Sequence, residues 1–362
     1  MKLKFFIFLL TMSFCSFAQT LTLAPLQVPK FNLAKLNASG GPYTTQDADL
    51  LTLFTNPALF SSLQKKWSIS ALAFNGRARE NASSLLTEMS LVGPIAFGLT
   101  NTNFAFGIFN TTRLERNIDK ANNKYDLIFG EELFLTGGYG AKVFDNGNHS
   151  ISLGIQMKGY FQGFSVERDA TWSGTPAPYS NLFSSLSDAN PVMLTCAIGL
   201  DVGFLYNYAD FVKFGFTVQD AYTATFSTMY ANAAAFKASS SSGGTKYRSP
   251  IPVMNAGFSI QPKLPENYST FTRYIFWFDY CDFLSPLRNK RSILYNISFG
   301  MEFEFNKAYY IRLGLRELSP SFGVGVDAGF FELNTAASLS FKTKAAGSKT
   351  QPGFTVDFAI KL

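Results

Sequence analysis

The stretch LFLTGGYGAKVFDNGNHSISLGIQMKGYF, residues 133–161, decides the fold class. In its second half Ile151, Leu153 and Ile155 alternate with small or polar residues, and its first half alternates in the same way. A period of two is typical of a β-strand with one apolar and one polar face. The four residues between the halves, 145–148 (DNGN), are typical of a tight turn. The stretch therefore predicts one long antiparallel hairpin.

Two more hairpins show this alternation, across residues 196–218 and 297–315. Over the whole chain the pattern predicts about fourteen strands, near residues 67–76, 85–98, 104–113, 129–144, 149–165, 191–206, 211–226, 249–261, 270–281, 293–305, 308–317, 322–330, 333–343 and 353–362. Short links are expected near 99–103, 145–148, 207–210, 262–269, 306–307 and 331–332, and long ones at 114–128, 166–190, 227–248 and 282–292. Short turns at one end and long loops at the other are the layout of an outer-membrane β-barrel.

Composition supports a barrel over other membrane proteins. The chain has 362 residues, 47% hydrophobic and 16% aromatic but only 15% charged. A soluble domain carries roughly 25% charged residues. After residue 20 no run approaches the roughly 20 apolar residues that a spanning helix needs. A membrane β-barrel and an aromatic-rich soluble β-protein remain, and the alternating loop lengths favour the barrel.

The alternation of apolar and polar residues also continues to Leu362, so the last strand is placed to close a barrel, although assembly signals usually end on an aromatic residue.

The N-terminus predicts export. Lys2 and Lys4 precede the apolar run 5–10, and residues 16–18 (SFA) place small residues where a signal peptidase cleaves. We therefore expect a signal peptide over residues 1–18 and a mature protein in the outer membrane of a diderm bacterium. A lipoprotein anchor at the cysteine of this segment is the alternative, which the bulky residue before that cysteine disfavours. Cleavage removes the two lysines and lowers the net charge from +6 to +4.

Residues 19–66 form the second predicted region, because they do not alternate well. The apolar stretch 47–59 (DADLLTLFTNPAL) favours a plug, or hatch, folded into the lumen of the barrel. The alternative is a periplasmic tail, since chain termini are frequently unstructured. Residues 67–362 are then the transmembrane barrel, and the fold class is all-β.

The sequence lacks the parts of several chemical sites. Only Cys196 and Cys281 remain after cleavage, and His149 is the single histidine. These residues are too few for a disulfide framework, a histidine-based metal site or a histidine-dependent triad. No basic cluster points to nucleic acid. We expect no cofactor, no metal and no enzyme activity; an acyl hydrolase is a weak alternative, since His149 is assigned to the periplasmic turn.

The charges of the last strands predict an ion network in the lumen. If the turn at residues 306–307 sets the register, Glu302 faces Arg312, and the next strand brings Asp327 to the other side of Arg312. A register slip by one residue would place Arg312 in lipid, at a cost of about 2–4 kcal/mol at the midplane, so this register is favoured. The network is expected to be structural, not catalytic.

Several motifs give the chain a family resemblance. Asn56-Pro57-Ala58, just before the first strand, resembles the hatch motif of FadL-type long-chain fatty-acid transporters and of related barrels that include the PorV type. Fourteen strands fit that family. Similar strand patterns stand at residues 214–220, 300–303, 312–316 and 322–326.

The resemblance implies a plugged barrel that admits hydrophobic small molecules, such as long-chain fatty acids, through the outer membrane. It also implies a hatch that rearranges and a gap in the wall through which cargo leaves sideways. The expected partners are outer-membrane lipid and a hydrophobic ligand. The alternative is a PorV-like barrel whose partner is an exported protein and which transports no small molecule.

Two physical features accompany the resemblance. Gly93-Pro94 falls inside a predicted strand, where proline donates no ladder hydrogen bond, so a wall kink or a bulge at the barrel rim is expected. In addition, four large apolar residues are expected to face inward: Phe134, Tyr160, Ile275 and Trp277. An apolar lumen suits a lipid-like ligand, but the same side chains are also suited to pack on a hatch.

Overall fold

The computed structural model describes residues 33–41, 43–46, 50–63, 66–77, 88–119, 124–171, 191–239, 241, 245–264, 270–286, 292–344 and 347–361. The expected signal peptide, residues 1–18, lies outside the described residues, as does the first part of the region expected to be a hatch. Among the described residues no helix is both long enough and apolar enough to cross a membrane.

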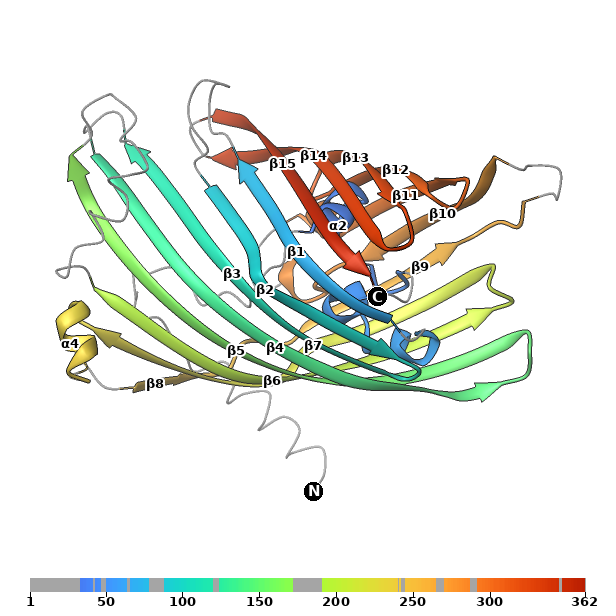
Figure 1. Ribbon diagram of the computed structural model, residues 1–362, viewed down its shortest axis with the longest axis horizontal. Coiled ribbons are helices and arrows are strands. Elements are labelled where there is room, and N and C mark those ends of the chain that lie inside the picture. Colours follow the sequence, from blue (N-terminus) through green and yellow to red (C-terminus); the bar gives the residue numbers. More distant parts are fainter. Residues whose placement is uncertain are drawn as a thin grey trace. The chain divides into compact units, whose positions relative to one another are not determined.

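In the described part of the chain one antiparallel sheet contains fifteen strands (Figure 1). They are β1 (Lys66–Arg77), β2 (Glu88–Asn101), β3 (Phe104–Asp119), β4 (Lys124–Asp145), β5 (His149–Thr171), β6 (Val192–Tyr208), β7 (Val212–Tyr230), β8 (Thr245–Arg248), β9 (Val253–Ile260), β10 (Phe271–Tyr280), β11 (Ile297–Phe305), β12 (Tyr309–Arg316), β13 (Ser319–Asp327), β14 (Phe331–Lys344) and β15 (Gly347–Lys361).

The sheet closes on itself. β1 pairs with both β2 and β15, and β6 pairs with both β5 and β7. β8 and β9 both pair with β7, at different heights, and so share one place in the ring. The ring therefore has fourteen places, and the predicted antiparallel β-barrel is confirmed. The last strand closes it, with Ser68 opposite Lys361.

Four details of the sequence-based prediction are wrong. The strand expected at 249–261 begins only at Val253, as β9, and the short strand β8 lies within the long link expected at 227–248. The turn expected at 331–332 lies at residues 328–330, because Phe331 already pairs in β14. The long link expected at 114–128 is mostly strand, since β3 and β4 continue to 119 and from 124 although polar residues interrupt the alternation there. Finally, the turn between β12 and β13 contains only Glu317 and Leu318, so that end of the barrel does not carry long loops throughout.

The strands differ widely in length around the ring. β4 and β5 have 22 and 23 residues, whereas β11, β12 and β13 have 9, 8 and 9. About 9–11 tilted residues span a bilayer. One side of the wall is therefore at or just below this length, and the other extends well beyond it, as the short orange and long green strands of Figure 1 show.

The exterior is apolar and the interior is polar. On β5, Met157 is 62% exposed and Ile155 is also exposed, whereas Gln156 and Lys158 between them are buried. The alternation continues on the neighbouring strands, where Leu135, Ile198 and Phe216 are exposed. Apolar-out and polar-in is the arrangement of a barrel whose outer surface meets hydrocarbon, and it is the reverse of a soluble core.

We expect Met157→Arg to lower the stability of the barrel in lipid by about 2–4 kcal/mol, the cost of a cation near the bilayer midplane. Tyr208→Arg is the matched control: Tyr208 is also exposed but ends β6 next to a turn, and near the interface the cost falls to about 0–1 kcal/mol. Urea titration of folding in lipid vesicles measures both. Equal costs for the two variants would contradict a lipid-facing position for Met157.

Candidate functional site in the barrel lumen

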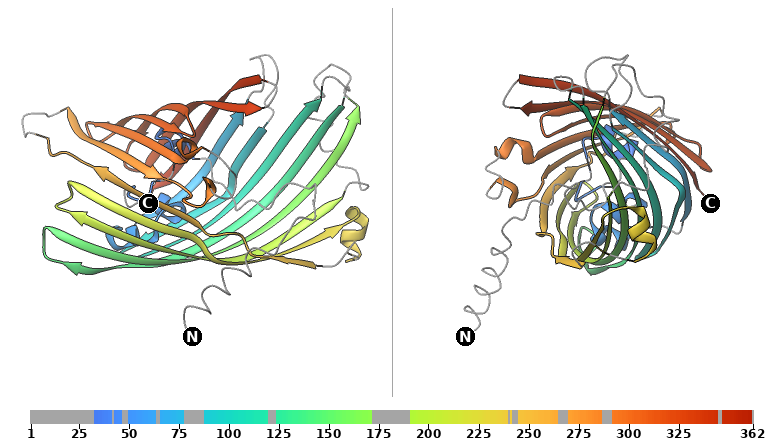
Figure 2. Two further views of the ribbon diagram at one scale, coloured as in Figure 1. Left: turned by 180° about the vertical axis from the view of Figure 1, so that it is seen from behind. Right: turned by 90° about the vertical axis from the view of Figure 1, so that its left-hand side faces the viewer.

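A short N-terminal segment occupies the interior of the barrel. We call the described residues between 33 and 63 the lumenal segment; it contains α2 (Ala34–Ala38) and the 3-10 helices η1 (Leu50–Phe54) and η2 (Pro57–Ser62). Figure 2 shows it in blue, surrounded by strands in the end-on view. Its buried residues meet inward-facing side chains from opposite parts of the wall, described below.

The Asn56-Pro57-Ala58 element lies against β6. The Asn56 side-chain oxygen accepts a hydrogen bond of 3.0 Å from the Ala58 amide and so caps η2, with Pro57 at the first helical position. The Asn56 amide nitrogen donates to the Thr44 carbonyl at 2.7 Å and to the Phe204 carbonyl at 3.1 Å. One side chain therefore joins the helix start, the preceding loop and the wall.

Three glycines in register receive this element. Gly140 of β4 lies opposite Gly154 of β5, which lies opposite Gly203 of β6; we call them the glycine row. A Cβ added at Gly140 would lie 2.6 Å from the Pro57 carbonyl oxygen, and one at Gly154 or Gly203 would overlap the Asn56-Pro57-Ala58 backbone or the Asn56 side chain. Only residues without a side chain allow so close an approach of two backbones.

The first part of the lumenal segment contacts the opposite wall. Gly314 of β12 faces Gly300 of β11, and a Cβ at either position would overlap the backbone of Ser39 or Gly40. Gly40 has a φ of +90°, which favours glycine. The Ser321 hydroxyl donates to the Ala38 carbonyl at 3.1 Å. The segment is thus held on two sides of the lumen.

Polar side chains of the wall hold the segment between these points. They bond mainly to its backbone: Gln156 to the Leu53 carbonyl at 2.8 Å, Gln219 to the Phe54 and Thr55 carbonyls at 3.5 and 3.4 Å, Asp279 to the Thr44 amide at 2.7 Å, and Asp357 to the Ala34 amide. Ser61 donates to the Ser152 hydroxyl at 2.8 Å. Within the segment, the Tyr43 hydroxyl donates to the Ser39 carbonyl at 2.6 Å, and burial raises the pKa of Tyr43 well above its ordinary value, which keeps the phenol protonated.

Two of the four apolar residues expected in the lumen belong to an aromatic cluster with the lumenal segment. Phe134 and Tyr160 are buried together with Leu53 and Phe60. The Phe54 ring centre lies 6.1 Å from that of Phe134. We call this the aromatic cluster; its buried and partly buried members are Leu33, Leu50, Leu53, Phe54, Phe60, Leu63, Ala105, Phe109, Phe134, Tyr160 and Ala197.

The other two expected lining residues, Ile275 and Trp277, are buried against Tyr43. The Trp277 and Tyr43 rings stack with their centres 5.5 Å apart and an angle of 11° between their planes. All four expected residues therefore face inward and pack on the lumenal segment. Any apolar molecule in this part of the lumen has to replace contacts with the segment.

The structure contains the Glu302–Arg312 pair of the expected ion network but not its third member. Glu302 lies opposite Arg312, and Arg312 Nε is 2.6 Å from Glu302 Oε2. The prediction for Asp327 is wrong: Gly323 lies opposite Arg312, and Asp327, four residues further along β13, is displaced by about 13 Å at 3.3 Å per residue. The second partner of Arg312 is Asn334, at 2.8 Å.

Asp327 belongs to a separate group at the end of β13. Its carboxylate is 2.6 Å from Lys361 Nζ, which also contacts Glu332 at 2.6 Å. Glu332 lies opposite Asp327 in the next strand. The lysine of the last strand therefore joins β13, β14 and β15 near the turn between β13 and β14.

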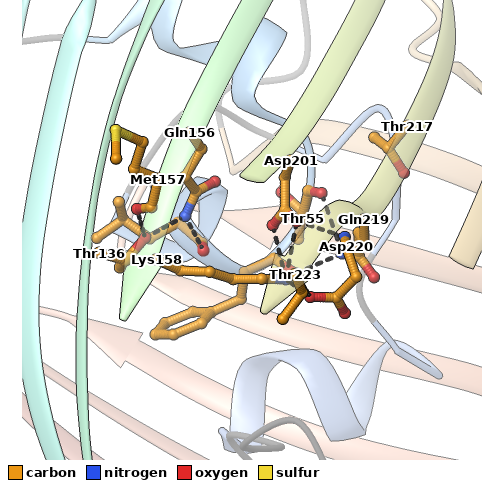
Figure 3. Close-up of polar contacts among 12 residues, drawn as sticks. Thr55, Thr136, Gln156, Met157, Lys158, Asp201, Thr217, Gln219, Asp220 and Thr223 are labelled. Atoms are coloured by element: carbon orange, nitrogen blue, oxygen red, sulfur yellow. Dashed lines mark hydrogen bonds and ion pairs between the residues drawn. The ribbon is translucent and has the colours of Figure 1, made fainter. Parts of the chain in front are cut away.

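A second buried ion cluster was not expected from the sequence (Figure 3). Lys158 Nζ lies 2.8 Å from Asp201 Oδ1 and 2.9 Å from Asp220 Oδ1, and the Thr223 hydroxyl donates to Asp220 at 2.6 Å. We call these four residues the Lys158 cluster; they lie on β5, β6 and β7. The alternation marks Lys158 and Asp201 as inward-facing, but Asp220 reaches the lumen only through a bulge, where its φ is +54°.

Gly93-Pro94 lies inside β2, at an irregularity of the ladder. The register shifts between Val92 and Ala96 toward β3, and between Val92 and Phe97 toward β1. His149, the expected turn residue, begins β5, with its Nδ1 2.7 Å from the Tyr206 hydroxyl.

Comparison with known proteins defines the fold further. No protein-family model and no curated protein sequence matches the chain. Among solved structures, the CymD monoaromatic hydrocarbon channel is 12% identical, with a TM-score of 0.51 over 92% of this chain and 99% of that one. The chain has the fold of a FadL-type barrel. Two further structures are similar. The Ralstonia pickettii toluene transporter TbuX is 12% identical, with a TM-score of 0.47 over 90% of this chain and 98% of that one. A Pseudomonas aeruginosa FadL homologue is 13% identical, with a TM-score of 0.43 over 93% of this chain and 99% of that one.

We expect Gly154→Ala to displace the Asn56-Pro57-Ala58 element, because its Cβ would overlap the Pro57 backbone. The barrel should then admit small hydrophilic solutes in a liposome-swelling assay while keeping its heat-modifiable gel mobility. Gly163→Ala, on the same strand, is the control, since a Cβ there meets nothing within 4 Å. Equal permeability of the two variants would show that the glycine row does not hold the lumenal segment.

We expect Lys158→Met to destabilise the barrel by about 3–5 kcal/mol, because it leaves two buried carboxylates without their cation. Adding Asp201→Asn and Asp220→Asn to this variant should restore much of the loss, since no buried charge then remains unpaired. Urea titration in lipid vesicles measures both variants. A triple variant as unstable as the single one would contradict a role based on charge pairing.

Proposed function

We propose that this chain is an outer-membrane barrel that admits hydrophobic small molecules into the cell envelope of a diderm bacterium. The observation that carries the proposal is the aromatic cluster, in which the lumenal segment and the wall make an apolar region within an otherwise polar lumen. The likeness in fold to a monoaromatic hydrocarbon channel supports the same class of cargo.

The cargo class follows from the chemistry of this interior. Phe54 packs on Phe109 and Phe134 through tilted rings with centres 5.1 and 6.1 Å apart. Apolar contacts of this kind are non-directional, so an alkyl chain or an aromatic ring is able to replace the Phe54 ring at little cost. We propose long-chain fatty acids as the first cargo to test, with monoaromatic hydrocarbons beside them.

Passage requires the lumenal segment to move. The side chains of the aromatic cluster are held by apolar packing, and the η1 backbone accepts hydrogen bonds from Gln156 and Gln219. Asn56 and the residues around Ser39 are held in addition by close backbone contact with glycines. We infer that η1 moves first and that the Asn56-Pro57-Ala58 element and η2 leave the wall after it. The segment then acts as a hatch, and residues 19–66 are its proposed extent.

A disulfide between Ser61→Cys and Ser152→Cys tests this movement, because the two hydroxyl oxygens lie 2.8 Å apart. It is made in a chain in which Cys196 and Cys281 are replaced by Ala. We expect uptake of a fluorescent fatty acid by proteoliposomes to fall when the disulfide forms and to return on reduction. Each single cysteine variant is the control.

Uptake that is the same with and without the disulfide would contradict a moving hatch. A wild-type barrel that takes up neither fatty acids nor monoaromatic hydrocarbons would contradict transport itself. Capture of an exported protein by such a barrel would then favour the PorV-like function.

A further inference from the structure

The strand β8 lies at the end of the barrel opposite the short turns. β7 has 19 residues, about twice the 9–11 that span a bilayer, and it begins next to the short turn at residues 209–211. β8 pairs with residues 225–228, near the other end of β7. Figure 1 shows β8 and the short helix α4 (Ala233–Lys237) together at that end. Short turns of outer-membrane barrels face the periplasm, so β8 and α4 are expected at the cell surface.

β8 is an edge strand. Among the described strands it pairs with β7 alone, and it stands at the end of the strand order. All four of its residues are exposed. An edge strand presents unpaired backbone groups as well as its side chains to the molecules beside it. β8 is therefore accessible from the outer side of the wall as well as from the lumen.

Two cations lie side by side on β8. Lys246 and Arg248 are two residues apart, so their side chains share one face of the strand, with backbones about 7 Å apart. Neither forms an ion pair with the described part of the chain, whereas the inward cations Lys158, Arg312 and Lys361 each contact a carboxylate. Two neighbouring like charges repel each other, and binding of an anion removes that repulsion.

The chain around β8 contains no acidic residue to supply this anion. Residues 221–252 include three basic residues, Lys237, Lys246 and Arg248, and neither aspartate nor glutamate. Lys237 is exposed at the end of α4. Charge complementarity therefore points to an anionic partner from outside the chain.

Exposed aromatic rings lie next to these cations. Tyr247 shares the outward face with Phe226; their ring centres are 5.5 Å apart, and both rings are exposed. Tyr222, earlier on β7, is exposed as well. Beyond them, the exposed ring of Phe236 in α4 packs edge-on against Tyr230. Aromatic girdles of this kind mark the interface between membrane and water in outer-membrane barrels.

The two cations are able to reach the outward face around the open edge. Lys246 lies opposite Ser227 and Arg248 opposite Thr225, and Thr225 is buried on the inner side of the wall. Lysine and arginine have long apolar stems that carry the charged end away from the backbone. Because no described strand covers the far edge of β8, both charged ends can meet a ligand that lies against Tyr247.

We propose that this surface binds a phosphorylated glycolipid of the outer leaflet, such as lipid A. Lys246 and Arg248 bind its phosphate groups at the edge of β8, where the arginine fork suits phosphate oxygens. Phe226 and Tyr247 contact its acyl chains and sugar. A free phosphate would leave these rings uncovered, so the lipid fits the whole surface. The inference goes beyond uptake and rests only on the proposed outer-membrane location.

Native mass spectrometry of the detergent-purified barrel, titrated with lipid A that carries two phosphates, tests the proposal. We expect Lys246→Gln with Arg248→Gln to lower the affinity about thirtyfold, because each basic residue near an anionic lipid surface contributes about fivefold. The matched control removes two exposed lysines from the short-turn end of the barrel, Lys263→Gln with Lys307→Gln. This control should keep the affinity of the wild type.

Two further measurements separate the charged from the apolar contacts. Lipid A without phosphates should bind the wild type about as weakly as the phosphorylated form binds the variant that lacks Lys246 and Arg248. Increasing ammonium acetate should weaken binding to the wild type but not to that variant. Tyr247→Ser should lower the affinity while the dependence on salt remains, because it removes a ring and no charge.

Equal affinity of the wild type and the variant without Lys246 and Arg248 would overturn the proposal, as would equal binding of lipid A with and without phosphates. Displacement of lipid A by an equal concentration of inorganic phosphate would make this a free-phosphate site instead. A disulfide between two barrels through Tyr247→Cys, in a chain without the native cysteines and in bilayers with lipid A, would show that a second copy covers the surface. None of these readouts involves uptake, so the lipid site and the uptake function stand or fail separately.

Discussion

The rest of the structure follows from one constraint: a barrel wall in hydrocarbon has only its lumen in which to place polar side chains. Apolar residues such as Met157 and Ile198 take the outer positions, so Gln156, Lys158 and Arg312 have to face inward. An inward polar group that is shielded from water costs free energy unless it is hydrogen-bonded. The lumenal segment provides such hydrogen bonds, because its backbone carbonyls accept from inward glutamines of the wall and its backbone amides donate to inward aspartates.

The same constraint explains why the segment is held so close to the wall. Gly154 and Gly203 have no side chains, so the backbone of the wall and that of the Asn56-Pro57-Ala58 element approach closely. The Asn56 side chain then donates one hydrogen bond to the lumenal segment and one to the wall. The apolar contacts of Phe54 are of a different kind, since no geometry fixes them. The lumenal segment thus makes two kinds of contact in separate places, apolar packing at η1 and close backbone contact at the Asn56-Pro57-Ala58 element.

The sequence was sufficient to predict the outer face but only part of the lumen. The alternation of apolar and polar residues predicted the strands and the fourteen places of the ring. Whether a side chain faces outward depends only on its place along its own strand, and not on how that strand pairs with its neighbours. Glu302 and Arg312 follow from a single tight turn. Asp327 was placed wrongly because its position depends on a second register, and Asp220 was missed because a bulge changes the face of one residue. The contacts of Asn56 with Thr44 and Phe204 were also beyond prediction, since they join segments distant in the chain.

The bulge at Asp220 connects the buried charges to the end of the β7–β9 ladder. Gln219 faces the lumen, where it bonds the lumenal segment, so strict alternation would place Asp220 on the lipid face. An ionised carboxylate there is unfavourable, and the bulge instead turns Asp220 inward to Lys158. The same bulge ends the pairing of β7 with β9 at Gln219, and Pro250 and Pro252 match it on the other side. One local change of backbone thus pairs a buried charge and ends the ladder beside it, so the Lys158 cluster and the end of the β7–β9 pairing have a single structural cause.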